Sequence, residues 1–436
     1  MYRRILALLL CAVLFWSCAA SACAEESVGP GRQLRQLVVL GRHHIRSPLA
    51  DKGSWIARIT PHDWFEWTSK PGELSPRGAM LAAAMGRYFR LWLEKEGLFA
   101  EDEVPGDGAV RFYANGLQRT QATARCFSAG LFPASPVPVE CHVEYNQMDA
   151  LFLPLILFMN EAYARDVRKE IAERGGGEGL CGYRESLGEA LALLMDVTDM
   201  EASEAYRSGA FGDLLTDETE MYLFEGDTPS LSGPIQMANS VADALILQYY
   251  EEADDLKAAF GHELSMDDWK KIGSVLGTYE EILFTSPLLA VNLAHPMLKE
   301  LFAELHTPER KFSFLCGHDC TIASVLAALG VEDYVLPGAV EPTTPIGVNV
   351  VFERWTNREG EAFYKVELIY QSTEQLRSIQ ALSPDEPPMI VPLSFEGVAA
   401  DEHGMMAEKD FMGLFTEKIE AFRELQERYM ESEIAA

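Results

Sequence analysis

Three short apolar runs, each ending in a polar turn, constrain the fold of this chain more than any other feature. They lie at residues 37–40, 110–114 and 312–316, and each stops at a glycine or an Asn-Gly pair. The second and third are followed at once by a sequence typical of a helix. Runs of this kind are typical of buried strands in an α/β sheet. Because ligands of such sheets bind beyond the carboxyl ends of the strands, we expect the three turns to lie together around a site.

The rest of the chain predicts an α/β domain that is interrupted by helices. Residues 146–285 show apolar residues at helical spacing in several segments, so we expect an inserted all-helical domain there. Residues 25–145 and 286–436 would form the α/β domain, in which a central, mixed, mostly parallel sheet is flanked by helices. Two further strands are expected at 348–352 and 364–370.

Residues 1–24 are typical of a secretory signal peptide. Arg3 and Arg4 precede an apolar stretch too short to span a bilayer, and Ala22-Cys23-Ala24 offers a cleavage site between small residues. A lipid anchor on Cys18 is the alternative, but the bulky residues before it do not fit a lipid-attachment site. We therefore expect a periplasmic or secreted protein without a membrane anchor after cleavage.

The charge of the chain limits its partners. It has 36 Lys and Arg against 67 Asp and Glu, which gives a formal net charge of −31. A field of this sign repels nucleic acid and anionic membranes, so we expect neither as a partner. An anionic small molecule would need a local cluster of cations to bind. The sequence carries no signal for the oligomeric state.

The cysteines allow at most two disulfides. Five remain after the expected cleavage: Cys126, Cys141, Cys181, Cys316 and Cys320. In an oxidising compartment an odd number leaves at least one thiol unpaired. Sequence alone does not fix the connectivity. We expect a disulfide between Cys126 and Cys141, because closing a loop of that size stabilises a fold by about 3 kcal/mol in the chain-entropy model.

If the three turns meet, they bring together several cationic and titratable side chains. These are Arg42, His43, Arg46, Arg119, His318 and Asp319. Three guanidinium groups around one point repel each other unless an anion lies between them, and their planar, forked donors match phosphate oxygens. Two expected helix N-termini at the same turns also favour an anion. The cluster therefore predicts a site for a phosphate monoester.

Two members of the cluster suit the chemistry of phosphoryl transfer. His43, between two arginines, could attack phosphorus and form a phosphohistidine intermediate, while the arginines neutralise the oxygens. Asp319 could protonate the leaving alkoxide and then accept a proton from water. It must be protonated for the first step, so we expect an acidic optimum. This chemistry requires no metal and no other cofactor.

Each of these signals also has a plainer interpretation. Taken alone, His43 could be structural, His318-Asp319 could form a helix cap, and Arg119 could be a surface arginine; only their conjunction favours a site. Cys316-x-His318-x-Cys320 could suggest a metal site, but it lacks the paired two-residue gaps of a structural zinc site. A protein that only binds an anion is a further alternative, although it would need neither the nucleophile nor the acid.

At these residues the chain resembles the histidine acid phosphatases, the two-domain branch of the histidine phosphatase superfamily. Their signature is Arg-His-Gly-x-Arg-x-Pro with a distal His-Asp pair; here residues 42–48 read RHHIRSP and residues 318–319 read HD. The resemblance implies the phosphoglycerate mutase-like fold with a helical insertion. It also implies that His43 is the nucleophile and Asp319 the proton donor, and that the phosphate ligands are Arg42, Arg46, Arg119 and His318.

Within the family, the chain is similar to the bacterial periplasmic glucose-1-phosphatases from Val38 to about Arg377, with dispersed matches such as residues 114–120 and 370–377. This similarity implies hydrolysis of sugar phosphates, glucose 1-phosphate in particular. A phytase or a broad-specificity acid phosphatase with the same mechanism is the alternative, although the negative charge disfavours phytate. His44 departs from the family signature, which has glycine there. Its side chain either lines the substrate site or packs beneath the loop.

Overall fold

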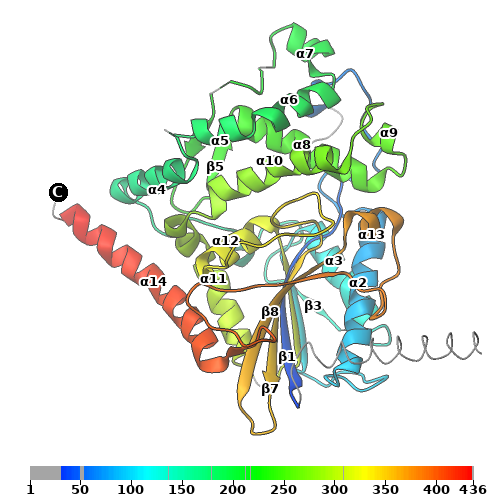
Figure 1. Cartoon of the computed structure of the whole chain (residues 1–436), viewed down its shortest axis with the longest axis vertical. Coiled ribbons are helices and arrows are strands. Elements are labelled where there is room, and N and C mark those ends of the chain that lie inside the picture. Colours follow the sequence, from blue (N-terminus) through cyan, green and yellow to red (C-terminus); the bar gives the residue numbers. More distant parts are fainter. Residues whose placement is uncertain are drawn as a thin grey trace, which may run out of the picture.

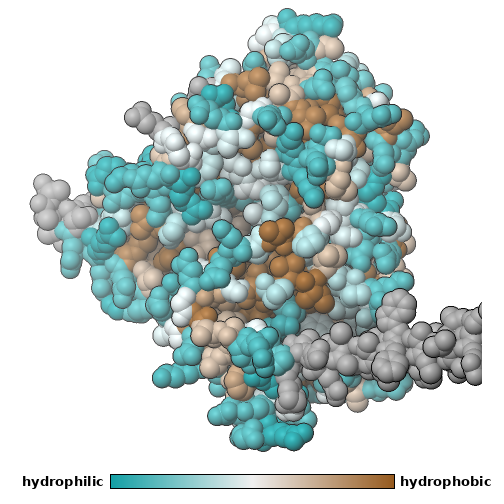
Figure 2. Space-filling model, viewed as in Figure 1, coloured by the Kyte–Doolittle hydropathy of each residue, from teal (hydrophilic) through white to brown (hydrophobic). Residues whose placement is uncertain are grey.

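The computed structural model describes residues 31–49, 54–135, 137–177, 179–211, 213–216, 218–307 and 309–434. The expected signal peptide at residues 1–24 lies outside these ranges. Within them, no helix has both the length and the apolar character needed to cross a membrane. Figure 2 shows that hydrophilic residues cover most of the visible face, with smaller hydrophobic areas between them.

An eight-stranded sheet forms the centre of the molecule (Figure 1), in the order β10-β8-β7-β1-β6-β2-β3, with β9 paired to β8. Its strands are β1 (Gln33–Arg42), β2 (Val110–Ala114), β3 (Val139–Glu140), β6 (Phe312–Gly317), β7 (Asn349–Thr356), β8 (Ala362–Tyr370), β9 (Met389–Pro392) and β10 (Met406–Ala407). The strands β1, β6, β2 and β3 run parallel, whereas β7 to β10 pair antiparallel. The predicted α/β fold with a mixed sheet is confirmed, and its parallel part is one half of the sheet.

Helices cover both faces of this sheet, which explains the uninterrupted apolar runs of its central strands. Leu37 and Val39 of β1 pack into one core with residues of α2 (Pro76–Lys95) and α3 (Gln118–Leu131). Val38 and Leu40 point to the other face. The helices on that face are α11 (Pro287–Leu305), α12 (Asp319–Leu329) and α14 (Glu408–Ile434). A strand that is buried on both faces needs apolar residues at successive positions.

The remaining helices gather beyond one end of the sheet (Figure 1). They are α4 (Glu161–Arg174), α5 (Cys181–Ser186), α6 (Gly188–Val197), α7 (Glu204–Arg207), α8 (Pro234–Glu251), α9 (Asp255–Ala258) and α10 (Met266–Phe284). The short hairpin of β4 (Glu220–Tyr222) and β5 (Ser230–Ser232) lies in the same segment, and α13 (Thr373–Ser378) follows β8. The core of this segment also takes in Ile45, Ile59 and Leu81 from the α/β part. The division at residues 146 and 285 stays a prediction.

The expected disulfide between Cys126 and Cys141 is wrong for this structure. All five cysteines within the described residues are free thiols. Cys141 lies 3.4 Å from Nε2 of Gln121 and donates to the carbonyl of Val143 at 3.2 Å. Gln121 precedes Cys126 on α3 by more than one helical turn, and a turn advances about 5.4 Å along the axis. Cys141 is therefore not bonded to Cys126 in this structure.

Candidate active site

The expected convergence of the three turns is confirmed by the register of the sheet. In the parallel ladder Arg42 at the end of β1 is level with Gly317 at the end of β6, and Cys316 of β6 is level with Ala114 of β2. The next residues of all three strands therefore emerge at one edge. Arg42 ends β1 and residues 43–46 follow it, Asn115 follows β2, and His318 follows β6.

The backbone and ring of His43 are fixed by hydrogen bonds to neighbouring strand ends. Its amide donates to the carbonyl of Gly317 at 3.0 Å, and its carbonyl accepts from Gly347 at 3.3 Å. Nδ1 lies 2.9 Å from the carbonyl oxygen of His44, so Nδ1 carries the proton and Nε2 keeps its lone pair. Burial, and then the positive charge of Arg119, hold the pKa of His43 well below its usual range. The ring is neutral and has the electron pair that a nucleophile needs.

His318 stands beside this ring, with the two ring centres 5.4 Å apart in an edge-to-face arrangement. Its Nε2 lies 2.7 Å from the amide nitrogen of Asn115. The amide oxygen of Asn115 accepts from the backbone of Gly116 and Asp149, so the amide nitrogen donates to His318. Burial, followed by the charge of Arg119, lowers the pKa of His318 to about 3. Its other nitrogen, Nδ1, is left as a donor.

Three guanidinium groups surround the two imidazoles, as the sequence predicts. Arg42 forms an ion pair with Asp319 at 2.7 Å, and Nη2 of Arg46 lies 3.0 and 3.1 Å from the two carboxylate oxygens of Asp243. Arg119 donates a long hydrogen bond to the carbonyl of Gly72, at 3.4 Å. The Nε atoms of all three arginines are buried and have no hydrogen-bond partner among the described residues. Unused, buried donors of this kind suit a bound oxyanion.

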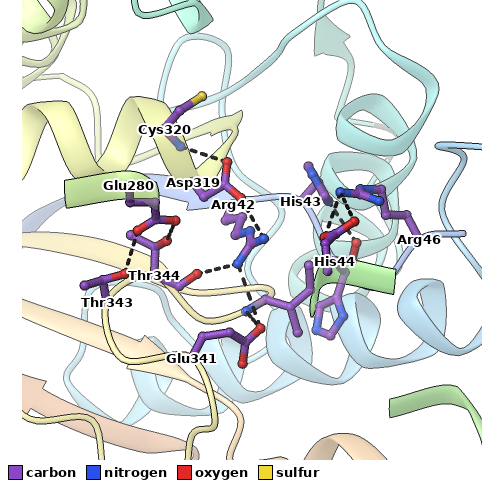
Figure 3. A network of polar contacts seen from close by, with 12 residues as sticks. Arg42, His43, His44, Arg46, Glu280, Asp319, Cys320, Glu341, Thr343 and Thr344 are labelled. Atoms are coloured by element: carbon purple, nitrogen blue, oxygen red, sulfur yellow. Dashed lines mark hydrogen bonds and ion pairs between the residues drawn. The ribbon is translucent and has the colours of Figure 1, made fainter. Parts of the chain in front are cut away.

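Asp319, the first residue of α12, faces the cleft with its side chain one-third exposed (33%). Its Oδ1 accepts from the amide of Cys320 at 2.8 Å, while Oδ2 pairs with Arg42 (Figure 3). Burial raises the pKa of this carboxyl, but Arg42 and then His318 outweigh that effect and hold it below its usual range. In the resting site Asp319 is therefore ionised.

Three of these residues line a cleft of about 740 Å³ between the sheet edge and the helices α8 and α10. Arg42, Arg46 and Asp319 lie at its floor. Its walls include residues that the sequence analysis did not identify as site residues: Asp243 on α8, Glu280 on α10, and Glu341, Thr343 and Thr344 before β7. Helical periodicity predicts that α8 and α10 are partly buried, but it does not tell which residue meets the strand ends.

His44 packs beneath the loop and not on the wall of the cleft. Its side chain is 2% exposed, Nε2 lies 2.9 Å from the side-chain oxygen of Gln371, and Nδ1 accepts from the amide of Ile45 at 3.0 Å. Burial lowers the pKa of His44 to about 4. Gly347 has φ +72°, and a Cβ there would lie 2.7 Å from the His44 ring, so only glycine fits against it. These contacts favour the alternative in which His44 packs beneath the loop.

The Cys316-x-His318-x-Cys320 spacing does not form a cluster of metal ligands in this structure. Within the described residues, no group of three or more His, Cys, Asp and Glu side chains is arranged to hold a metal ion. Burial raises the pKa of both Cys316 and Cys320, which keeps them as thiols and not as the thiolates that metals bind.

Known proteins share both the sequence and the fold. The family described as histidine phosphatase superfamily (branch 2) matches residues 33–170. The glucose-1-phosphatase of Providencia rettgeri is 33% identical over 427 residues, which cover 96% of this chain and 100% of the relative. The glucose-1-phosphatase of Salmonella typhimurium is 34% identical over 391 residues, 88% of this chain and 92% of the relative.

A solved structure extends the comparison to the fold. The phytase of Hafnia alvei in its apo form superposes with a TM-score of 0.82 at 26% identity, covering 90% of this chain and 98% of the phytase. The fold of the present chain is therefore that of a histidine acid phosphatase. The chain belongs to branch 2 of the histidine phosphatase superfamily and is a phosphoric monoester hydrolase.

Proposed function

We propose that this enzyme hydrolyses sugar monophosphates, glucose 1-phosphate in particular, through a phosphohistidine on His43 with Asp319 as the general acid. The observation that carries the choice of substrate is the distribution of charge in the cleft. Arg42 and Arg46 are the only basic side chains among the described residues that line it, and both lie at the floor. The cations suffice for one phosphate group.

The walls of the cleft suit an uncharged, hydroxyl-rich group. Acidic side chains lie on them at Asp243, Glu280 and Glu341, and the carboxylate of Asp243 would repel a second phosphate of a substrate. Neutral donors and acceptors are available on α8 at Gln236 and Asn239. Such a lining favours a sugar over phytate, which carries a phosphate on every carbon.

The reaction follows from the roles of the two residues. The lone pair of Nε2 of His43 attacks phosphorus, and the bond between phosphorus and the leaving oxygen breaks while Asp319 gives that oxygen its proton. In the second step Asp319 takes a proton from a water molecule, whose oxygen attacks phosphorus and frees His43. Arg42, Arg46, Arg119 and His318 stabilise the charge on the three remaining phosphate oxygens.

The resting ion pair of Asp319 explains how the acid receives its proton. A phosphate that enters the site competes for Arg42 and brings negative charge close to the carboxyl. Loss of the cation and gain of an anion both raise the pKa of a carboxyl group. Asp319 is then protonated when the substrate is bound, at acidic pH.

A phytase is the second candidate, because the Hafnia alvei structure that shares the fold is a phytase. The test compares kcat/KM for glucose 1-phosphate, p-nitrophenyl phosphate and phytate at pH 5, with and without a chelator. We expect glucose 1-phosphate to exceed phytate by about tenfold or more, since each extra phosphate meets like charge, and the chelator to have no effect. A ranking that favours phytate would assign a phytase. Binding of phosphate without turnover would contradict the enzyme mechanism.

We also propose that the protein is periplasmic or secreted, from the signal-like sequence of residues 1–24. The proposed helical domain at 146–285 supplies α8 and α10, and so the upper walls of the cleft.

A further inference from the structure

Glu280 is a buried carboxyl group in the cleft for which the mechanism above has no role. It lies on α10, is 8% exposed, and faces the turn before β7. The hydroxyl of Thr343 donates to one of its oxygens and the hydroxyl of Thr344 donates to the other (Figure 3). Both oxygens are thereby tied to one short turn of the α/β part.

The same turn holds the guanidinium group at the floor of the cleft. The carbonyl of Thr344 accepts a hydrogen bond from Nη1 of Arg42, while Nη2 of Arg42 pairs with Asp319 at 2.7 Å (Figure 3). A continuous chain of hydrogen bonds therefore runs from Glu280 through Thr344 to Arg42. A change at Glu280 can reach the phosphate site along this chain.

Among the described residues, Glu280 forms no ion pair. Arg42 is the nearby positive charge, and it is shared with Asp319 and with Glu341, whose carboxylate lies 4.0 Å away. The other groups that face Glu280 are neutral or negative: Cys320 and Asp319 on α12, and Tyr334. Burial, and then the charge of Asp319, raise the pKa of Glu280 to about 7.

We propose that Glu280 is a positioning residue that orients Arg42 through Thr344 and, by gaining or losing one negative charge, sets how tightly the cleft holds a phosphate dianion. The proposal rests on the phosphate site described above. In acid Glu280 is neutral, and the entering dianion meets one carboxylate fewer. As the pH rises from 6 to 8, the ionised fraction of a group with a pKa of about 7 rises from about one tenth to nine tenths. The new charge lies beside the bound dianion and repels it.

Before an anion binds, His43, His318 and Arg119 keep their charge state in this range of pH. The pKa of His43 is held well below its usual range and that of His318 is about 3, so both rings stay neutral. Arg119 keeps its charge, because burial lowers its pKa only to about 10. Glu341 also has a raised pKa, caused by burial, so the test must separate it from Glu280.

The experiment measures the inhibition constant of sulfate, a dianion that does not titrate, from pH 5.5 to 8.5 with p-nitrophenyl phosphate as substrate. In the wild type we expect the constant to rise by about tenfold or more around pH 7, because a like charge appears in a low-dielectric cleft. In Glu280→Gln the rise should disappear. Glu281→Gln is the matched control, because Glu281 lies on the same helix but is 41% exposed and pairs with Arg174. It should keep the rise of the wild type.

A second variant keeps the test decisive if Glu280→Gln fails to fold. Thr343→Val removes one hydrogen bond to the charged carboxylate, so the midpoint of the rise should move to higher pH. A rise that persists unchanged in Glu280→Gln, or a midpoint that does not move in Thr343→Val, would overturn the proposal and point to Glu341 or Asp319. These outcomes are independent of the sugar substrate, because failure to hydrolyse glucose 1-phosphate would leave the sulfate measurement intact.

Discussion

Asp319 lies 2.7 Å from Arg42, so the candidate acid and one of the candidate phosphate ligands neutralise each other in the resting site. Because of this ion pair, substrate binding both occupies Arg42 and changes the surroundings of Asp319. The phosphate that replaces Asp319 as the partner of Arg42 also creates the conditions under which Asp319 takes up a proton. A protonated acid is therefore coupled to an occupied phosphate site.

His43→Ala should abolish turnover while sulfate still binds. The phosphohistidine cannot form without the ring, and loss of a covalent nucleophile lowers kcat by about 1,000-fold or more. The measurement is kcat for p-nitrophenyl phosphate, with the binding constant of sulfate determined by calorimetry. His142→Ala, at a side chain that is 57% exposed, is the control. Retention of a tenth of the activity in His43→Ala would rule out this nucleophile.

Asp319→Asn should harm substrates with poor leaving groups most. The alkoxide of glucose needs a proton as it leaves, whereas p-nitrophenolate is stable without one. We expect kcat to fall by about 100-fold or more for glucose 1-phosphate and by far less for p-nitrophenyl phosphate. Rapid-quench kinetics of the first turnover would measure both. Equal losses for the two substrates would show that Asp319 is not the acid.

Asp243→Asn should shift the enzyme toward substrates with several phosphates. Its carboxylate lies on the wall of the cleft 3.0 Å from Arg46, and its removal leaves one negative charge fewer on that wall. The ratio of kcat/KM for phytate to that for glucose 1-phosphate should rise by about threefold or more. Asp267→Asn, at an exposed position in the first turn of α10, should not change the ratio. An unchanged ratio in Asp243→Asn would mean that the charge of the wall does not select the substrate.

Burial of the His44 ring should make the protein less stable in acid. Its pKa is about 4 in the folded state against an ordinary 6.5, so its contribution is complete above pH 6.5 and is lost as the pH falls toward 4. Between pH 7 and pH 5 this costs about 2 kcal/mol of unfolding free energy. Urea unfolding at pH 7 and at pH 5 measures this loss of unfolding free energy. The loss should be smaller in His44→Asn than in the wild type, by about 2 kcal/mol. The exposed His306→Asn is the control, and the same drop in all three proteins would contradict the buried neutral ring.

Reduction should leave the stability unchanged. Because Cys126 and Cys141 are free in this structure, neither dithiothreitol nor Cys141→Ser should lower Tm by more than a few degrees. A native disulfide would be worth about 2–5 kcal/mol, which is readily seen in a thermal scan. Thiol titration of the unfolded protein is the independent measurement. A large loss of Tm on reduction would instead support the disulfide that the sequence suggests.

The sequence predicts the floor of the site far better than its walls. The runs at 110–114 and 312–316 correspond closely to β2 and β6, because strands buried on both faces leave an unambiguous apolar pattern. The same pattern does not record direction, which is why the antiparallel pairing of β7 and β8 could not be told from a parallel one. Strand ends converge by topology, so residues at those ends could be grouped without coordinates.

The walls depend on how helices pack. Asp243 reaches Arg46 only because α8 crosses the end of the sheet, and helical periodicity does not encode that crossing. Glu280 carried a usable signal: it lies four residues after Leu276 and three before Leu283, on a stripe that otherwise reads as apolar. A carboxyl group at such a position indicates either a buried ion pair or a site. The disulfide prediction was wrong because loop length says nothing about which way two side chains point.

The floor and the walls of the cleft come from different parts of the chain. The reaction at phosphorus and the choice of the attached alcohol are therefore separate properties of the enzyme. In the proposed mechanism, strand ends supply the groups that break the bond to phosphorus, and α8 and α10, inserted between β3 and β6, face the group attached to it. Evolution, or a protein engineer, can therefore change the accepted alcohol by remodelling α8 and α10, provided that Asp243, which pairs with Arg46, and Glu280, which contacts the turn beside Arg42, are retained.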